Sequence, residues 1–233
     1  MKRSCLMALL LTAFLAGCGE QKKDTKKQIE DIDKAARWIV KNASSYEGDN
    51  KRLYLAGHSS GGVNAVAEAL LSISPEMIHD YGFEKRDYEY HGLVLDCGLM
   101  HFYKNSIAYK GMRSMVFPKK YKKDWRYNYL LFDRNNDINR LPKTVIITNE
   151  SDELKAMSYY FDELLKSRNV EHILFEKGPK GHMGVIFNLK LGESLCDATA
   201  IKPFARALYL KAIIDAPRVT KYFPPSDKSH ASF

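Results

Sequence analysis

Long apolar runs are absent from this 233-residue chain, and its most apolar stretch, Cys5 to Leu15, is too short to span a bilayer comfortably. The stretch follows two basic residues and ends in Leu15-Ala16-Gly17-Cys18. A basic start, a short apolar run and a small-residue end are typical of a secretory signal peptide rather than of a transmembrane helix. The sequence therefore predicts export.

The last four residues of this leader resemble a bacterial lipobox, in which the cysteine becomes the lipid-bearing first residue of the mature protein. The resemblance implies a lipoprotein signal peptide over residues 1–17, diacylglycerol on Cys18 and a tether over residues 18–24. We therefore expect a protein held in the bacterial cell envelope by a lipid anchor on Cys18. The absence of aspartate directly after Cys18 slightly favours the outer membrane. An ordinary signal peptide with a chance cysteine is the alternative.

Cysteine is also scarce. Of the four cysteines, only Cys97 and Cys196 lie beyond the leader. One pair so far apart in sequence is not the framework of a disulfide-rich domain, so we expect two buried free thiols, with a bridge between them as the alternative. The chain also lacks a cluster of His, Cys and Asp residues at metal-site spacing, and we expect neither a metal nor another cofactor.

Basic residues exceed acidic ones, and the formal net charge is +8, or +6 (8 − 2) without Lys2 and Arg3 of the leader. Many lysines gather over residues 22–27 and 119–123. No helix-turn-helix, zinc-finger or RNA-binding signature accompanies them, so we predict no nucleic-acid partner. A solvated face near an anionic membrane surface explains the charge more simply.

The stretch Leu53-Tyr-Leu-Ala-Gly-His-Ser-Ser-Gly-Gly62 carries the clearest chemical signal. Apolar residues lead into a glycine-flanked serine, and an Ala-rich helical pattern, Val63 to Ile73, follows at once. The turn fits G-x-S-x-G, a nucleophile elbow, whose small residues allow the tight turn that lifts the serine hydroxyl above a sheet. Ser59 is therefore the candidate nucleophile, and an ordinary loop is the alternative.

The rest of the pattern predicts an α/β fold. Apolar positions from Ile29 to Val40 share one face of a helix, which should pack on a sheet. Further strands and a closing helix are expected at Tyr90–Asp96, Lys143–Thr148, Val170–Glu176 and Ala205–Ile214. Strands separated by helical patterns indicate a mostly parallel sheet of about four strands with flanking helices.

A helix ending in Ala-Arg-Trp-Ile, a turn and the elbow strand resemble the α/β-hydrolase superfamily, especially its carboxylesterase and prolyl-oligopeptidase-like branches. The resemblance covers about the C-terminal half of the usual sheet, because no convincing strand lies between Cys18 and the elbow. It implies a truncated α/β-hydrolase domain over residues 25–216. Residues 99–141, rich in aromatic residues and lysine, lie where many relatives carry a cap over the active site, and a simple packed lid is the alternative. The end, residues 217–233, is rich in Pro, Ser and Lys and is expected to be loose.

The resemblance also implies the chain order serine, acid, histidine for a catalytic triad. Asp152 follows a predicted strand and best matches the acid; Glu150 is the fallback, and a helix cap is the alternative role for Asp152. His182 lies in a glycine-rich loop after the last predicted strand and matches the base, with a surface-loop histidine as the alternative. The backbone N–H of Ser60 would hold the oxyanion.

Two other histidines are expected to play structural roles. His58 precedes the nucleophile and should shape the elbow, with its side chain pointing away from Ser59. His91 lies in or just before a strand and should be a structural histidine.

A glycine-rich His-Gly-Gly-Gly loop, the usual source of a second oxyanion donor, is missing from the sequence. Losing one such donor typically lowers the rate about 100- to 1,000-fold. The strand Leu53–Ala56 would also lose its usual neighbour and become an open apolar edge. The tether, a second copy of the chain or a separately encoded N-terminal half could cover this edge.

The sequence thus predicts a lipid-anchored serine hydrolase that cleaves carboxylic esters, with small esters or acylated carbohydrates as substrates. A peptidase of the prolyl-oligopeptidase-like kind is one alternative. A truncated hydrolase that serves as a binding or scaffold lipoprotein is the other. The sequence does not specify the acyl group, the alcohol or the oligomeric state.

Overall fold

A computed structural model describes residues 25–46, 48–101, 110, 126–177, 181–182 and 218–222 of the chain. The leader, the tether and Cys18, the predicted helix Ala205–Ile214, Cys196 and most of the insert lie outside these residues. Within the described residues, no helix has both the length and the apolar character needed to cross a membrane.

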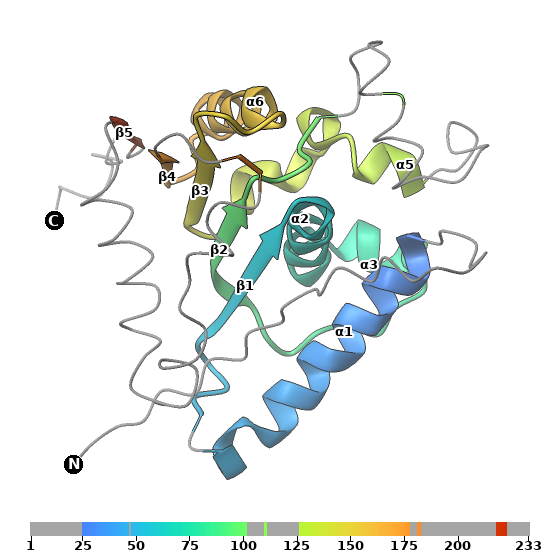
Figure 1. Cartoon of the computed structure of the whole chain (residues 1–233). Helices are drawn as coiled ribbons and strands as arrows, with labels where there is room; N and C mark the ends of the chain where they lie inside the picture. Colours follow the sequence, from blue (N-terminus) through green and yellow to red (C-terminus); the bar gives the residue numbers. More distant parts are fainter. Residues whose placement is uncertain are drawn as a thin grey trace, which may run out of the picture.

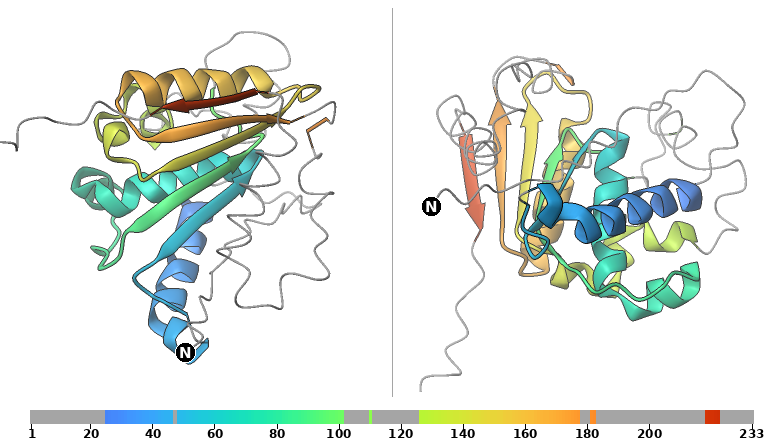
Figure 2. Two further views of the ribbon diagram at one scale, coloured as in Figure 1. Left: turned by 90° about the vertical axis from the view of Figure 1, so that its left-hand side faces the viewer. Right: turned by 90° about the horizontal axis from the view of Figure 1, so that it is seen from below.

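The centre of the protein is a sheet of five strands in the order β1-β2-β3-β4-β5 (Figures 1 and 2). The strands are β1 (Leu53–His58), β2 (Tyr90–Asp96), β3 (Thr144–Asn149), β4 (His172–Lys177) and β5 (Arg218–Tyr222). The first four run parallel and follow one another in chain order. The predicted mostly parallel sheet is therefore confirmed, with strand bounds within two residues of those expected.

The expectation that all of residues 217–233 form a loose tail is wrong at its start, because Arg218–Tyr222 form β5. This strand pairs antiparallel with β4, and Val219 lies opposite Phe175. The Pro, Ser and Lys content of the tail as a whole hid a short segment with a valine, a threonine and a tyrosine, residue types that favour strands.

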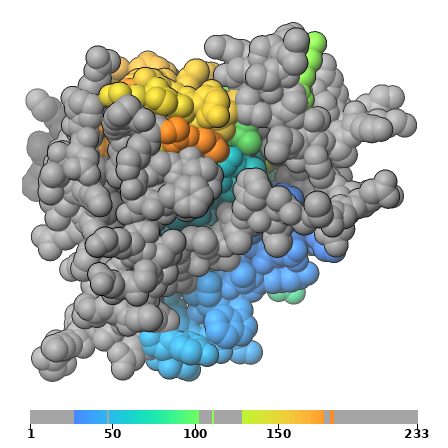
Figure 3. Space-filling model, viewed as in Figure 1, coloured from blue at the N-terminus to red at the C-terminus, as the bar shows by residue number. Residues whose placement is uncertain are grey.

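Helices pack against the sheet and against one another. The longer helices are α1 (Thr25–Asn42), α2 (Ser60–Ile73) and α6 (Lys155–Ser167). The shorter α-helices are α3 (Pro75–Tyr81) and α5 (Arg126–Tyr129). Short 3₁₀ helices are η1 (Ala43–Tyr46), η3 (Phe132–Arg134) and η4 (Asn136–Arg140). α2 contacts β1 and β2, α6 contacts β3 and β4, and α1 packs on α2. The space-filling view shows that α1 (blue) and α6 (yellow) both reach the surface (Figure 3).

The predicted apolar face of α1 is confirmed, since Ile29, Ile32 and Ala36 are buried. α2 lies deeper, and ten of its residues are buried, which explains why it has little polar surface. α3 begins after Ser74, whose hydroxyl accepts a hydrogen bond from the N–H of Met77.

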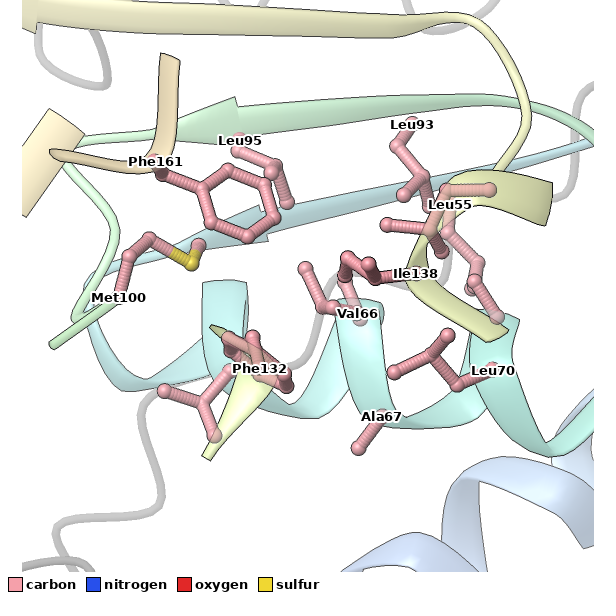
Figure 4. Packing of buried hydrophobic residues seen from close by; sticks show 14 of the residues in the cluster. Leu55, Val66, Ala67, Leu70, Leu93, Leu95, Met100, Phe132, Ile138 and Phe161 are labelled. Carbon is pink, nitrogen blue, oxygen red and sulfur yellow. The ribbon is translucent and has the colours of Figure 1, made fainter. Parts of the chain in front are cut away.

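The main core fills the space between the sheet and α2. Side chains of Leu55, Leu93 and Leu95 from the sheet meet Val66 of α2 and Phe161 of α6 (Figure 4). The end of the predicted insert also contributes, because the side chains of η3 and η4 that face inward are buried in the same cluster, namely those of Phe132 and Ile138. These residues belong to the core of the domain, while residues 102–109 and 111–125 of the insert lie outside the described part.

Among the described strands, β1 pairs only with β2 and forms one edge of the sheet. This is the edge expected from the sequence. The strand that carries the elbow is therefore supported on one side by β2 and on one face by α2.

Candidate active site

The turn between β1 and α2 has the geometry of a nucleophile elbow. Ser59 lies between the last residue of β1 and the first residue of α2, with φ 55° and ψ −121°. A non-glycine residue at positive φ is strained, and such residues gather at functional sites. A Cβ atom on Gly57 would lie 2.2 Å from the carbonyl oxygen of Gly61, so only glycine fits there. The small residues of the motif thus allow the turn, as predicted.

Hydrogen bonds tie this turn to the end of β2. The N–H of Ser59 donates to the carbonyl oxygen of Asp96, and the N–H of Leu99 donates to the carbonyl oxygen of Ser59, both at 3.0 Å. Gly62 packs against the same segment, since a Cβ on it would lie 2.6 Å from Cε of Met100. The strained backbone of Ser59 is therefore held by the neighbouring strand as well as by its own helix.

The predicted acid, Asp152, lies three residues after the end of β3 and is 6% exposed. Its carboxylate accepts hydrogen bonds from the hydroxyl of Thr148 (3.2 Å) and from the N–H of Leu154 (3.0 Å). Burial alone would raise the pKa of Asp152, but hydrogen bonds from His182, from the N–H of Leu154 and from the Cys97 thiol hold that pKa below its usual value. The first residue before α6 is Leu154, and the bond from its N–H to the Asp152 carboxylate also stabilises the start of this helix, a role compatible with catalysis.

The predicted base, His182, is hydrogen-bonded to this acid. Its Nδ1 lies 2.8 Å from Oδ1 of Asp152, and its side chain is 23% exposed. The hydrogen bond that His182 donates to Asp152 raises the pKa of His182, burial opposes this effect, and the charges of Asp152, Glu153 and Asp96 raise that pKa further. Glu150, the fallback acid, is exposed. The structure therefore brings His182 and Asp152 together and places Ser59 at the carboxyl end of a nearby strand.

Ser60, the expected oxyanion donor, is the first residue of α2. Backbone N–H groups in the first turn of a helix have no partner within that helix, and the helix dipole is positive there. This position suits a group that must stabilise a developing negative charge.

Sequence reasoning missed a second pair next to the first. His58 Nδ1 lies 2.9 Å from Oδ2 of Asp96, and the ring centroids of His58 and His182 are 4.8 Å apart. The prediction that His58 only shapes the elbow is therefore incomplete, because its ring also contacts the predicted base. The signal in the sequence was an aspartate at the end of the strand after the elbow, but it could be used only once the two strand ends were known to lie side by side.

Two further polar residues, Asn149 and Cys97, surround the acid and the base. Nδ2 of Asn149 donates to the carbonyl oxygen of Gly181 (3.1 Å) and lies 3.5 Å from Sγ of Cys97. Cys97 is buried and free, as expected, and has φ 48°. The segment that carries His182 is thus attached to the end of β3 through the bond from Asn149 to Gly181.

One set of atoms in this site has a spacing that a metal ion could use. Ligand atoms of Cys97, Asp152 and His182 lie within 4.8 Å of one another. A thiol binds metals as the thiolate, and burial raises the pKa of the Cys97 thiol, which favours its protonated form when no metal is bound. Asp152 and His182 are already bonded to each other. The donor set therefore fits a hydrogen-bonded network better than a metal centre.

Comparison with known families decides the classification. A family model described as "alpha/beta hydrolase fold" matches residues 22–183, more than half of the chain. The chain belongs to the α/β-hydrolase family. Comparison with curated proteins returned no match.

Solved structures of α/β-hydrolase proteins share the fold of this chain. Esterase B from Lactobacillus rhamnosis, solved with an inhibitor, matches with a TM-score of 0.63 and 19% identity over 81% of this chain and 63% of its own. A hyperthermophilic esterase from the archaeon Pyrobaculum calidifontis matches with a TM-score of 0.55 and 24% identity over 76% of this chain and 61% of its own. This chain therefore spans less than two thirds of the length of either esterase.

Proposed function

We propose that this α/β-hydrolase is a serine esterase that cleaves carboxylic esters with Ser59, His182 and Asp152. The observation that carries the proposal is the 2.8 Å hydrogen bond between His182 and Asp152, formed at strand ends beside an elbow serine with φ 55°. A serine hydroxyl is a weak nucleophile at neutral pH and needs a base that is oriented by a third group. The chain order of the three residues and the bond between His182 and Asp152 support this assignment.

The reaction begins when Oγ of Ser59 attacks the ester carbonyl and Nε2 of His182 accepts the hydroxyl proton. Asp152 holds Nδ1–H of His182 and stabilises the imidazolium that forms. His182 then gives the proton to the departing alcohol, which leaves an acyl group on Ser59. Water, activated by the same histidine, releases the acid and restores the free serine.

We propose one donor for the oxyanion among the residues that the structure describes. The N–H of Ser60 at the start of α2 supplies one donor in the proposal. Without a second donor, the rate would be about 100- to 1,000-fold below that of an esterase with a complete oxyanion hole. We therefore propose a slow esterase with a small ester or an acylated carbohydrate as substrate.

We also propose that the protein is exported and anchored in the bacterial cell envelope by lipid on Cys18, with the outer membrane favoured. The leader motif Leu15-Ala16-Gly17-Cys18 supports this location. Growth with labelled palmitate should label the wild-type protein and leave Cys18→Ala unlabelled. Equal labelling of both proteins would contradict the anchor.

The esterase proposal is tested by hydrolysis of p-nitrophenyl esters of increasing acyl length. Ser59→Ala should remove the activity, because no attacking oxygen remains. Ser45→Ala, a change of an exposed serine in η1, is the matched control and should keep it. Equal rates for the wild type and Ser59→Ala would disprove the proposed nucleophile. Peptide substrates in the same assay test the prolyl-oligopeptidase-like alternative.

The edge position of β1 favours one non-enzymatic alternative, a binding or scaffold lipoprotein. Unpaired backbone groups on an edge strand can pair with another chain, and we propose self-association through β1. Sedimentation velocity over a range of concentrations should show dimers. If the protein stays monomeric throughout, self-association through β1 is wrong.

A further inference from the structure

We propose that His58 and Asp96 form a second histidine–aspartate pair that positions the base His182. The inference rests on the proposed function, because it gives His182 the role of base. Two observations support the inference. Nδ1 of His58 lies 2.9 Å from Oδ2 of Asp96, and the ring centroids of His58 and His182 are 4.8 Å apart.

The register of the sheet creates the second pair. His58 is the last residue of β1, Asp96 is the last residue of β2, and the two are direct partners across the parallel strands. The side chains are 14% and 11% exposed, so water has limited access to the bond between them. Asp96 also accepts a hydrogen bond from the N–H of Ser59 through its backbone oxygen. One residue thus holds the nucleophile's backbone and the imidazole beside it.

His182 is held from two further directions. Asp152 bonds its Nδ1, and Asn149 bonds the carbonyl oxygen of the preceding residue, Gly181. The ring of His58 meets that of His182 at an interplanar angle of 45°, and the 4.8 Å between the ring centroids lies within the range of separations at which aromatic rings attract each other. This contact restricts rotation of the base, and Asp96 keeps His58 in place to make it.

The pair of His58 and Asp96 also acts on His182 through the charge of Asp96. The groups that face His182 are Asp152 and Glu153 from the segment after β3, Asp96 from β2, the ring of His58 from β1 and the buried thiol of Cys97. The charge of Asp96 is one of the causes that raise the pKa of His182. Asp96 therefore helps to stabilise the imidazolium that forms when Ser59 loses its proton.

The ring contact is tested with His58→Ala and His58→Phe. Loss of an aromatic contact should lower kcat about two- to tenfold in His58→Ala with little change in KM, because the substrate itself is not touched. His58→Phe keeps a ring but cannot bond Asp96, so it should recover only part of the loss. His79→Ala is the matched control, since His79 also lies beside an aspartate, Asp80, but is exposed on α3.

The charge effect is tested with Asp96→Asn by two measurements. The acid limb of the kcat/KM profile should move to lower pH, because His182 then loses one cause of its raised pKa. The titration of the His182 ring, followed by NMR of its nitrogens, should move in the same direction. The NMR titration does not need activity, so it still tests the inference if the esterase proposal fails.

Each result decides between outcomes. Equal kcat values for the wild type and His58→Ala would show that the ring contact does not position the base, and full recovery in a folded His58→Phe would show that the bond to Asp96 is not needed. If the pKa of His182 is the same in Asp96→Asn and in the wild type, the charge of Asp96 does not influence the protonation of His182. Near-ultraviolet circular dichroism establishes that each variant is folded, and Asp96→Asn tests the pair even if His58→Ala does not fold.

Discussion

The buried carboxylate of Glu68 predicts that the protein loses stability as the pH rises. Glu68 lies on α2 with 0% exposure, and its oxygens contact the guanidinium of Arg86 (3.2 Å) and the hydroxyl of Tyr90 (3.1 Å). Asp33 of α1 lies 3.0 Å from the same nitrogen of Arg86. Asp33 also accepts a hydrogen bond from Nε of Arg37 (3.0 Å), so two guanidinium groups face the two carboxylates. The cost of ionising Glu68 therefore comes mainly from removing its charge from water.

The size of the expected loss of stability follows from the change in the pKa of Glu68 on folding. Burial raises the pKa of Glu68 from 4.5 to about 7, against the attraction of Arg86. Because the folded state holds this proton more tightly than the unfolded state, the stabilisation is fully present below pH 4.5. It is lost as the pH rises through about 7. The difference of about 2.5 units corresponds to about 3 kcal/mol of unfolding free energy.

Urea unfolding followed by circular dichroism at about pH 5 and about pH 8 measures this effect. Glu68→Gln carries no charge at either pH and should lose the part of the pH dependence that Glu68 causes. The raised pKa values of His172 and His182 also lower stability with rising pH, but they do so equally in both proteins. Parallel pH dependences for the wild type and Glu68→Gln would refute the reasoning.

Three further predictions concern the site. Gly57→Ala places a methyl group 2.2 Å from a carbonyl oxygen, so thermal or urea unfolding should show a loss of at least about 1–3 kcal/mol, and a fully stable variant would contradict the elbow packing. Asp152→Asn should lower kcat about 10⁴-fold in the ester assay, whereas Glu150→Gln should change little; the reverse order would make Glu150 the acid. Because neutral His182 is the base and its pKa is raised, activity should fall as the pH drops through a value above the ordinary histidine value of about 6.5, and a midpoint below that value would contradict the assignment.

The fold was predictable where the pattern is local. The apolar face of α1 and the continuous apolar runs of the four parallel strands identified these elements and nearly their bounds. β5 was missed because five residues within a polar tail give little signal, and its partner β4 lies far away in the sequence. Burial of Glu68 and Arg86 was not predictable either, since charged residues are seldom buried and only the contact between α2 and the loop before β2 brings them together.

Some residues of the candidate site could also be predicted from the sequence, and others could not. Ser59 followed from the spacing of glycines, and Asp152 and His182 followed from the chain order of a known family. His58 and Asp96 were not identified as a pair, because their contact depends on the register between β1 and β2. Asn149 was missed because its contact with Gly181 joins β3 to a segment after β4.

Covalent capture of Ser59 tests the central claim most directly. A fluorophosphonate should react with the folded protein and add one adduct, which peptide mass spectrometry should place on Ser59. Ser59→Ala should remain unmodified, and His182→Gln should react far more slowly because the base is lost. A folded wild-type protein that takes up no adduct, or that carries it on another serine, would contradict the assignment of Ser59 as the nucleophile.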